Sequence, residues 1–255
     1  MRLFMSVGVS LVAVGISGVA LLSSRAKGQD APATPPSAAP VFSEDFESGD
    51  LKPDVWTKVT KGTVAITVQS DVAAHGKNAL KVHYPAEPQA YAFAVASHLP
   101  DSLKLHFFGR AYVNFPKPIP AGHVVFITNG TAGYPTSNFF ELGNRQNKMQ
   151  PSYQQNGKDV PRGETMFGGP AYPIGKWFCL EWEFNDKPDS MTVWIDGEKV
   201  FETTKGYKAD STEDFVKGFT EFAFGFRSWG KGPADGFDVY YDDIALSTSR
   251  IGPVK

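Results

Sequence analysis

From Val41 onward, apolar and polar residues alternate over short stretches that are separated by segments containing Gly and Pro. Alternation with a period of two is typical of strands that bury one face. Asp196 and Gly197 form a two-residue turn signal, which predicts a hairpin that continues over 198–201. The one helix that the sequence predicts is short and covers 211–217. We expect strands over residues 62–69, 79–84, 91–97, 103–115, 123–128, 139–142, 177–184, 191–195, 221–228 and 239–247.

Short strands at this spacing predict an all-β fold, a concanavalin-like β-jelly-roll sandwich of two antiparallel sheets. Alternation also predicts which side chains face the core. Within 177–184, Phe178 and Trp182 share the inward side, whereas Glu181 lies on the other side. We expect one sheet to carry a stripe of polar side chains on an outer, concave surface, where such sandwiches bind glycans. The stripe would comprise His106, Arg110, Tyr112, Asn114, Glu181 and Glu183.

The composition argues against one class of function. The chain has 255 residues, a net charge of −2 and no block of Lys or Arg, so it lacks the basic surface of a nucleic-acid-binding protein. A hydrophobic content of 42% is enough for one large core. Cys179 is the only cysteine, so no disulfide forms within the chain. We expect a monomer.

The N-terminal region has the pattern of an export segment. Arg2 precedes an apolar run over 7–22, and Ser24-Arg-Ala26 fits a cleavage site between small residues. Residues 1–26 are therefore expected to be a signal peptide or an N-terminal anchor, and the Pro- and Ala-rich residues 27–40 a linker. The jelly-roll domain would cover 41–252 in a secreted or periplasmic protein. It would contact a membrane only if the first segment is not cleaved.

Two acidic segments lie at opposite ends of the expected domain, over 42–51 and 239–246. Both alternate like strands, yet both carry carboxylates where β-forming residues are usual. Adjacent first and last strands would bring these carboxylates together, and a hard cation with oxygen ligands would explain them. The alternative is that they are solvated charges that protect an edge strand from pairing.

Glu181 and Glu183 raise the hypothesis of a retaining glycosidase. Side chains two residues apart on a strand share one face at a separation of about 7 Å. Retaining enzymes hold their two carboxyl groups about 5–5.5 Å apart. The Glu-x-Asp-x-Glu signature of sandwich glucanases is also absent from this sequence. A solvated strand face is the simpler interpretation.

A second hypothesis is a lyase that cleaves uronic-acid chains by β-elimination. This chemistry needs a cation or amide against the carboxylate, a base for the proton on C5 and an acid for the leaving oxygen. We expect His123 to be the base, Arg110 to hold the carboxylate and Tyr153 to be the acid, all on one concave surface. Arg145 and Gln146 complete the candidates.

Two further hypotheses need no catalysis. A carbohydrate-binding domain would use the same polar groove, with Tyr172 and Trp229 among the rings that could stack on sugars. A structural or surface-attached protein would merely present its loops on the sandwich.

Six segments together resemble a known family, the secreted jelly-roll proteins of the fungal cellulose-induced (Cip) type and their bacterial relatives. That family is similar to glucuronan lyases and, more distantly, to alginate lyases. The segments are 42–49, 75–82, 109–113, 173–182, 193–197 and 240–252. They span nearly all of the expected domain.

The resemblance implies a structural calcium ion clamped between the termini. Its ligands would be backbone carbonyls of Asp45 and of the turn at His75, and the carboxylates of Glu47 and Asp243. The resemblance also implies a cleft on the concave sheet with Arg110, His123, Gln146 and Tyr153 as catalytic residues. Substrate would be bound by Arg145, Asn144, Glu141 and Glu181.

The chain departs from the family pattern at two places. Glu141 stands where relatives tend to carry an Arg, which leaves Arg145 as the nearby cation for an anionic substrate. Relatives also often carry a second Cys that pairs with the equivalent of Cys179. We predict a protein that acts on an extracellular polysaccharide, either as a β-eliminating lyase or as a non-catalytic binding domain.

Overall fold

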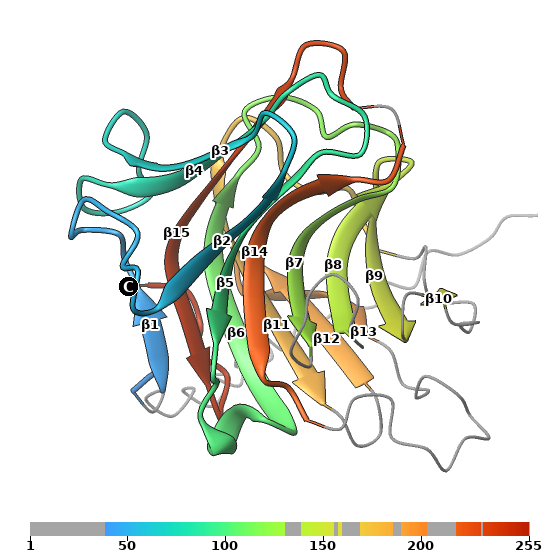
Figure 1. Cartoon of the computed structure of the whole chain (residues 1–255). Coiled ribbons are helices and arrows are strands. Elements are labelled where there is room, and N and C mark those ends of the chain that lie inside the picture. The colour runs from blue at the N-terminus through green and yellow to red at the C-terminus, as the bar shows by residue number, and fades with distance from the viewer. Residues whose placement is uncertain are drawn as a thin grey trace, which may run out of the picture. The chain divides into compact units, whose positions relative to one another are not determined.

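The computed structural model describes residues 39–130, 139–155, 158–159, 169–185, 190–202, 218–230 and 232–254, with only the backbone described at 139, 152–155 and 158–159. These residues form strands in two antiparallel sheets and one short 3₁₀ helix, η1 (Asp101–Leu103). The two sheets lie face to face as two layers (Figure 1). The prediction of an all-β jelly-roll sandwich is confirmed.

Sheet A has eight strands. Along the sheet these are β13 (Glu198–Glu202), β12 (Ser190–Ile195), β11 (Trp177–Asn185), β6 (His106–Asn114), β15 (Phe237–Ser247), β4 (Ala79–Tyr84) and β3 (Ala65–Gln69), with β1 (Phe42–Glu44) paired to β15.

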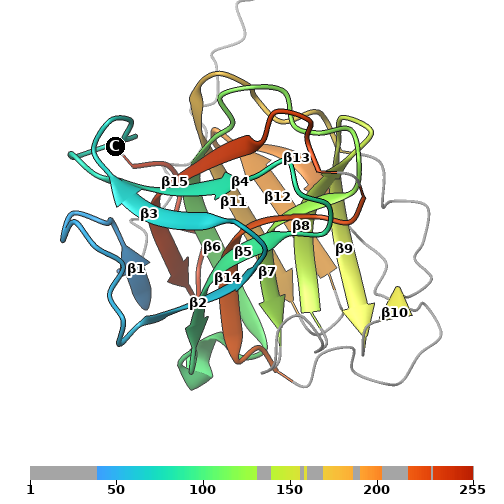
Figure 2. The same ribbon diagram turned by 45° about the horizontal axis from the view of Figure 1, so that its top comes forward.

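Sheet B has seven strands. In order they are β10 (Lys158–Asp159), β9 (Lys148–Gln155), β8 (Phe139–Arg145), β7 (Val124–Gly130), β14 (Glu221–Ser228), β5 (Tyr91–Ser97) and β2 (Trp56–Lys61). Figure 2 shows the two layers from a second direction.

The core between the sheets is built largely from aromatic rings. Phe178 and Trp182 of β11 point inward as predicted, and Phe222 of β14 stacks on Trp182 with ring centroids 5.9 Å apart. The hydroxyl of Tyr241 reaches across from sheet A to the carbonyl oxygens of Phe126 (3.1 Å) and Gly225 (2.5 Å) in sheet B. Because this polar group is satisfied inside an apolar core, it ties the layers together at little desolvation cost.

The predicted strands correspond closely to the observed ones. β4, β5 and β14 have the predicted bounds, and β13 follows β12 through the Asp196–Gly197 turn as expected. The sequence pattern missed β2 and β9. The expected helix over 211–217 lies outside the described residues, and so do the expected export segment and nearly all of the linker. No helix in the described ranges is long and apolar enough to cross a membrane.

The first and last strands lie side by side, as the acidic segments predicted. Phe42 pairs with Leu246 and Glu44 pairs with Ile244. A register shift interrupts β15 between Asp242 and Ala245. Asp243 sits in this bulge with a positive φ of 45°, so the simple alternation of faces breaks at the acidic pair.

Candidate functional site

Four side chains form a basic-aromatic cluster at one end of sheet B: Tyr91, His123, Arg227 and Trp229. Tyr91 begins β5 and pairs with Arg227 near the end of β14, while His123 directly precedes β7. Alternation directs Arg227 away from the core because its neighbour Phe226 is fully buried between the sheets. The cluster therefore lies on the outer face of sheet B.

Arg227 lies against two aromatic rings. Its guanidinium carbon is 3.4 Å from the ring centroid of Trp229 and 5.4 Å from that of Tyr91. The His123 ring stacks on Trp229 at a centroid distance of 6.1 Å, and the Trp229 amide donates to the His123 carbonyl (2.9 Å). Rings that hold a guanidinium in this way limit the side-chain conformational entropy that the Arg loses when a ligand binds.

The charge of Arg227 has no acidic partner among the residues that the structure describes. Its Nη1 atom is buried and makes no hydrogen bond there. A buried donor that lacks an acceptor is costly, and more so when it is charged. The oxygen atoms of an anionic ligand would remove that cost.

Next to this cluster, polar side chains continue across β7, β8 and β9. Glu141 pairs with Thr128, and Gly143 pairs with Gln150, so all four positions share the outer face of sheet B. Thr128, Glu141 and Gln150 are nevertheless buried. A Cβ at position 143 would lie 2.1 Å from the Val124 carbonyl oxygen, so glycine is required where β7 bulges toward β8.

The structure brings several predicted residues to the same end of sheet B as the cluster. Asn144 pairs with Val124, next to His123, and the Gln146 amide donates to the Ala121 carbonyl (2.9 Å). Arg145 and Gln146 are exposed at the β8–β9 turn. Asn144 is buried, and its amide donates to the Pro120 carbonyl (3.3 Å). This contact occupies one of its two amide hydrogens.

Two expected residues are placed differently. Tyr153 lies in β9 opposite Phe140, but its side chain is outside the described part. Tyr172, a candidate for stacking on sugars, is buried and its hydroxyl donates to the Gly143 carbonyl (3.2 Å). The expectation that Tyr172 is available to a ligand is therefore wrong, because packing and a hydrogen bond hold it in the core.

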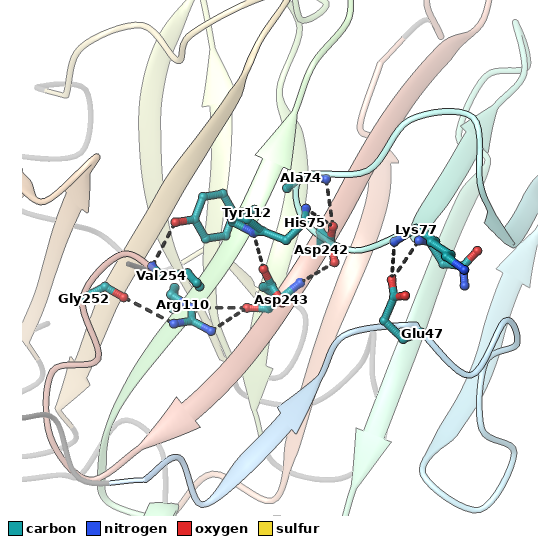
Figure 3. Close-up of polar contacts among 11 residues, drawn as sticks. Glu47, Ala74, His75, Lys77, Arg110, Tyr112, Asp242, Asp243, Gly252 and Val254 are labelled. Atoms are coloured by element: carbon teal, nitrogen blue, oxygen red, sulfur yellow. Dashed lines mark hydrogen bonds and ion pairs between the residues drawn. The ribbon is translucent and has the colours of Figure 1, made fainter.

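The prediction that Arg110 shares a concave surface with His123 is also wrong. Arg110 is on the outer face of sheet A, where its guanidinium donates to the carbonyls of Asp243 (3.3 Å) and Gly252 (3.4 Å) (Figure 3). The packed core separates this face from His123. Acid–base catalysis requires hydrogen-bond reach, so Arg110 cannot act in a site with His123.

Glu181 is likewise wrong as a substrate-binding residue. It is 1% exposed on sheet A, pairs with Arg250 (2.8 Å) and accepts the Gly252 amide (2.8 Å). Glu183, its expected glycosidase partner, is 2.7 Å from His106. Glu181 therefore holds the C-terminal segment through Arg250 and Gly252, and Glu183 pairs with a neighbour on the strand surface.

Comparisons with known proteins agree with this architecture. A family model described as polysaccharide lyase-like, Cip1-like core domain, matches residues 45–249. The chain belongs to this family. Among curated proteins, no sequence matches it significantly.

Two solved structures have the same fold as this Cip1-like domain. Cellulose induced protein Cip1 is 19% identical with a TM-score of 0.68, over 84% of this chain and 100% of that one. The endo-β-1,4-glucuronan lyase of the fungus Trichoderma reesei is 17% identical with a TM-score of 0.59, over 82% of this chain and 96% of that one. At such identities the likeness shows the fold alone.

The calcium site expected from the family centres on one turn beside β15. Glu47 accepts the amides of Lys77 (2.9 Å) and Asn78 (2.8 Å), and Asp242 accepts those of Ala74 (2.8 Å) and His75 (3.2 Å) (Figure 3). Burial raises the pKa of Asp242 to about 6. Both carboxylates thus face the same turn from opposite ends of the domain.

The Asp243 carboxylate, another expected ligand, lies 2.5 Å from Nδ1 of His75. The two expected carbonyl ligands, at Asp45 and at the turn of His75, stay predictions. In the described ranges, no three acidic, His or Cys side chains gather as a metal-binding group. The turn presents backbone N–H groups to both carboxylates, and Asp242 rather than Asp243 accepts from them. A calcium ion at this turn stays a prediction.

Sequence reasoning missed Arg227 and Tyr91 as site residues. The signal was available, because both are polar or amphipathic residues on strands whose neighbours Phe226 and Ala92 are buried. What the sequence lacked was the pairing of β14 with β5, which places Arg227 opposite Tyr91. The two strands are far apart along the chain.

Proposed function

We propose that this chain acts on an extracellular polysaccharide that contains uronic acids, and that it cleaves that chain by β-elimination on the outer face of sheet B. The main observation in support is Arg227, a cation that lies against Trp229 and Tyr91 and has no acidic partner in the described residues. Membership of a polysaccharide lyase-like family and the glucuronan lyase among its structural neighbours support the same substrate class.

In this proposal Arg227 neutralises the uronate carboxylate, and Arg145, which is exposed at the end of β8, would assist. A charge-assisted grip of this kind favours loss of the C5 proton, because the charge that develops on the carboxylate is stabilised. His123 accepts that proton as neutral imidazole. The C4–O bond then breaks to leave a C4=C5 double bond, and the leaving oxygen takes a proton from Tyr91 or Tyr153.

One observation favours a second candidate function, a non-catalytic carbohydrate-binding domain. The Nε2 atom of His123 is shielded from solvent, and its ring is stacked on Trp229. A base in that position would have to turn before it reached a sugar. In this alternative, Arg227 and Trp229 bind an acidic sugar without turnover.

The deciding experiment is ultraviolet absorbance of unsaturated products after incubation of the protein with a panel of uronic-acid polymers. The lyase proposal predicts product with wild type, and none with His123→Gln or Arg227→Ala. Retardation in affinity gels without product would select the binding domain. Neither product nor retardation on any polymer would overturn both.

We further propose a structural calcium ion at the turn between Ala74 and Asn78, held by the carboxylates of Glu47 and Asp242. Carboxylate oxygens are ligands that calcium prefers, and carbonyl oxygens of the turn would have to complete the set. Bound calcium would stabilise the folded state by mass action and lock β15 to the N-terminal segment. Export from the cell, expected from the N-terminal pattern, would place the protein where calcium is plentiful.

A further inference from the structure

The outer face of sheet A carries a second aromatic surface that the proposed function does not use. Trp177 of β11, Asn114 of β6, Tyr240 of β15 and Lys81 of β4 occupy one row, since each is the register partner of the next. Their strand neighbours Phe178, Val113 and Tyr241 are buried in the core. Alternation therefore directs the four side chains outward together.

The aromatic part of this row is a pair of rings in contact with each other. The rings of Trp177 and Tyr240 meet edge to face, with centroids 6.5 Å apart and planes at 66°. Both side chains are partly exposed. Two rings fixed on central strands give a ligand apolar contact area with little loss of conformational entropy on binding.

Asn114 pairs with both Trp177 and Tyr240 and carries a polar atom that has no hydrogen-bond partner among the described residues. Asn114 is 9% exposed, and its Oδ1 atom is buried and accepts no hydrogen bond within the described residues. Most buried side-chain acceptors in proteins are paired. An acceptor left unpaired beneath two partly exposed rings indicates a donor that comes from outside the chain.

The far end of the row is held by Asp238. Its two carboxylate oxygens contact Lys81 Nζ (3.0 Å) and His83 Nδ1 (2.7 Å), and Lys81 Nζ lies 5.6 Å from the Tyr240 ring centroid. Burial alone would raise the pKa of Asp238, but these two hydrogen bonds outweigh it and lower that pKa. The ionised Asp238 thus orients Lys81 and His83 beside the rings and compensates the charge of Lys81.

We propose that this row is a second glycan-binding surface that takes a neutral pyranose. The sugar would lie on the Trp177 and Tyr240 rings, donate a hydroxyl to Asn114 Oδ1 and contact Lys81 and His83 at its edge. A neutral sugar fits better than a uronate, because the cation here already has its carboxylate, unlike Arg227. The surface is on the opposite side of the sandwich from the basic-aromatic cluster, so one protein would hold two glycan segments.

The test is isothermal titration of the full chain with two probes, cellohexaose as the neutral probe and a glucuronan hexasaccharide as the acidic one. Trp177→Ala/Tyr240→Ala should weaken cellohexaose binding by about tenfold or more, as truncation of aromatic hot spots does. Arg227→Ala should leave cellohexaose binding unchanged. Trp194→Ala is the matched control, because Trp194 is on the same face but under Arg250.

Asn114→Ala keeps the proposal falsifiable if the double variant does not fold. The substitution removes an unpaired buried acceptor, so the melting temperature should hold or rise while cellohexaose binding falls several-fold. Unchanged cellohexaose affinity in both variants, or no cellohexaose binding by wild type, would overturn the second surface. Failure of the glucuronan hexasaccharide to bind would instead count against the proposed function at Arg227.

Discussion

The outer faces of the two sheets carry the same kinds of side chain and differ in how the charges are paired. On sheet A, Arg250 is paired with Glu181, and Arg110 is hydrogen-bonded to backbone carbonyls. On sheet B, Arg227 lies on Trp229 and Tyr91 and has no acidic partner in the part of the chain that is described. The number of cations on a face is thus a poor guide to ligand binding.

What distinguishes a binding cation is the state of its partners. A guanidinium that already donates to carboxylates and carbonyls has few free hydrogen-bond donors for a substrate. Removing it lowers the stability of the fold. A guanidinium held by aromatic rings keeps its hydrogen-bond donors for a ligand. This contrast predicts that removing a paired charge on sheet A, such as Glu181, changes stability, whereas removing Arg227 from the sheet B cluster changes binding.

The largest expected effect is loss of stability from Glu181→Ala. The substitution leaves Arg250 without its carboxylate, with only the Gly197 carbonyl as acceptor, and leaves the Gly252 amide without its acceptor. Breaking a buried pair costs about 3–5 kcal/mol, less here because Arg250 is partly exposed. Urea unfolding measures the change. Glu183→Ala is the control, since its contact with the exposed His106 is worth at most about 1 kcal/mol. Equal losses in the two variants would contradict the contrast.

Calcium should raise the melting temperature, and a chelator should lower it. At a calcium concentration of about a hundred times Kd, the expected stabilisation is about 2.7 kcal/mol. Differential scanning fluorimetry measures the shift. Asp242→Asn should abolish it, whereas Asp243→Asn should retain it because Asp243 is paired with His75. A shift that survives Asp242→Asn but not Asp243→Asn would restore the ligand set expected from the sequence.

Arg227→Ala should weaken binding of a uronic-acid polymer by roughly tenfold to a hundredfold, since a hydrogen bond to a charged group contributes about 1.5–3 kcal/mol. Affinity electrophoresis measures the loss. Arg227→Lys should recover only part of it, because Lys lacks the planar fork of donors. Lys61→Ala removes an exposed cation from the same row of sheet B and controls for net charge. An effect of Lys61→Ala as large as that of Arg227→Ala would show that net positive charge, and not a specific site at Arg227, determines binding.

The smallest expected effect concerns Cys179 on sheet A. Burial, reinforced by the charge of Glu181, raises the pKa of this thiol to about 12. Because the thiolate is the reactive form, a thiol reagent at mildly alkaline pH should modify the folded protein very slowly. The same reagent should react at once after unfolding in urea. Rapid modification of the folded protein would contradict the burial of the Cys179 thiol.

Local pattern was sufficient for most of the strands and for the direction of their side chains. Trp182 and Phe178 could be assigned to the core because alternation along a strand is a property of neighbouring residues. β2 was missed because Lys and Thr crowd its exposed positions, and β9 because Pro151 and several amides weaken its pattern. Side-chain direction in both follows from pairing with adjacent strands.

The site was decided by the tertiary structure. Arg110 lies within an alternating strand and His123 directly precedes one, and strand order assigns these two strands to different sheets. Asp242 and Asp243 are adjacent, yet at the bulge the Asp242 carboxylate accepts the backbone amide of His75, whereas the Asp243 carboxylate contacts the His75 ring. The sequence by itself determined most of the strands and their faces, because these follow from local alternation, and the two acidic segments indicated that the ends of the domain pair. Only the tertiary structure decided which cation keeps its donors for a ligand, because that depends on partners brought in from distant parts of the chain.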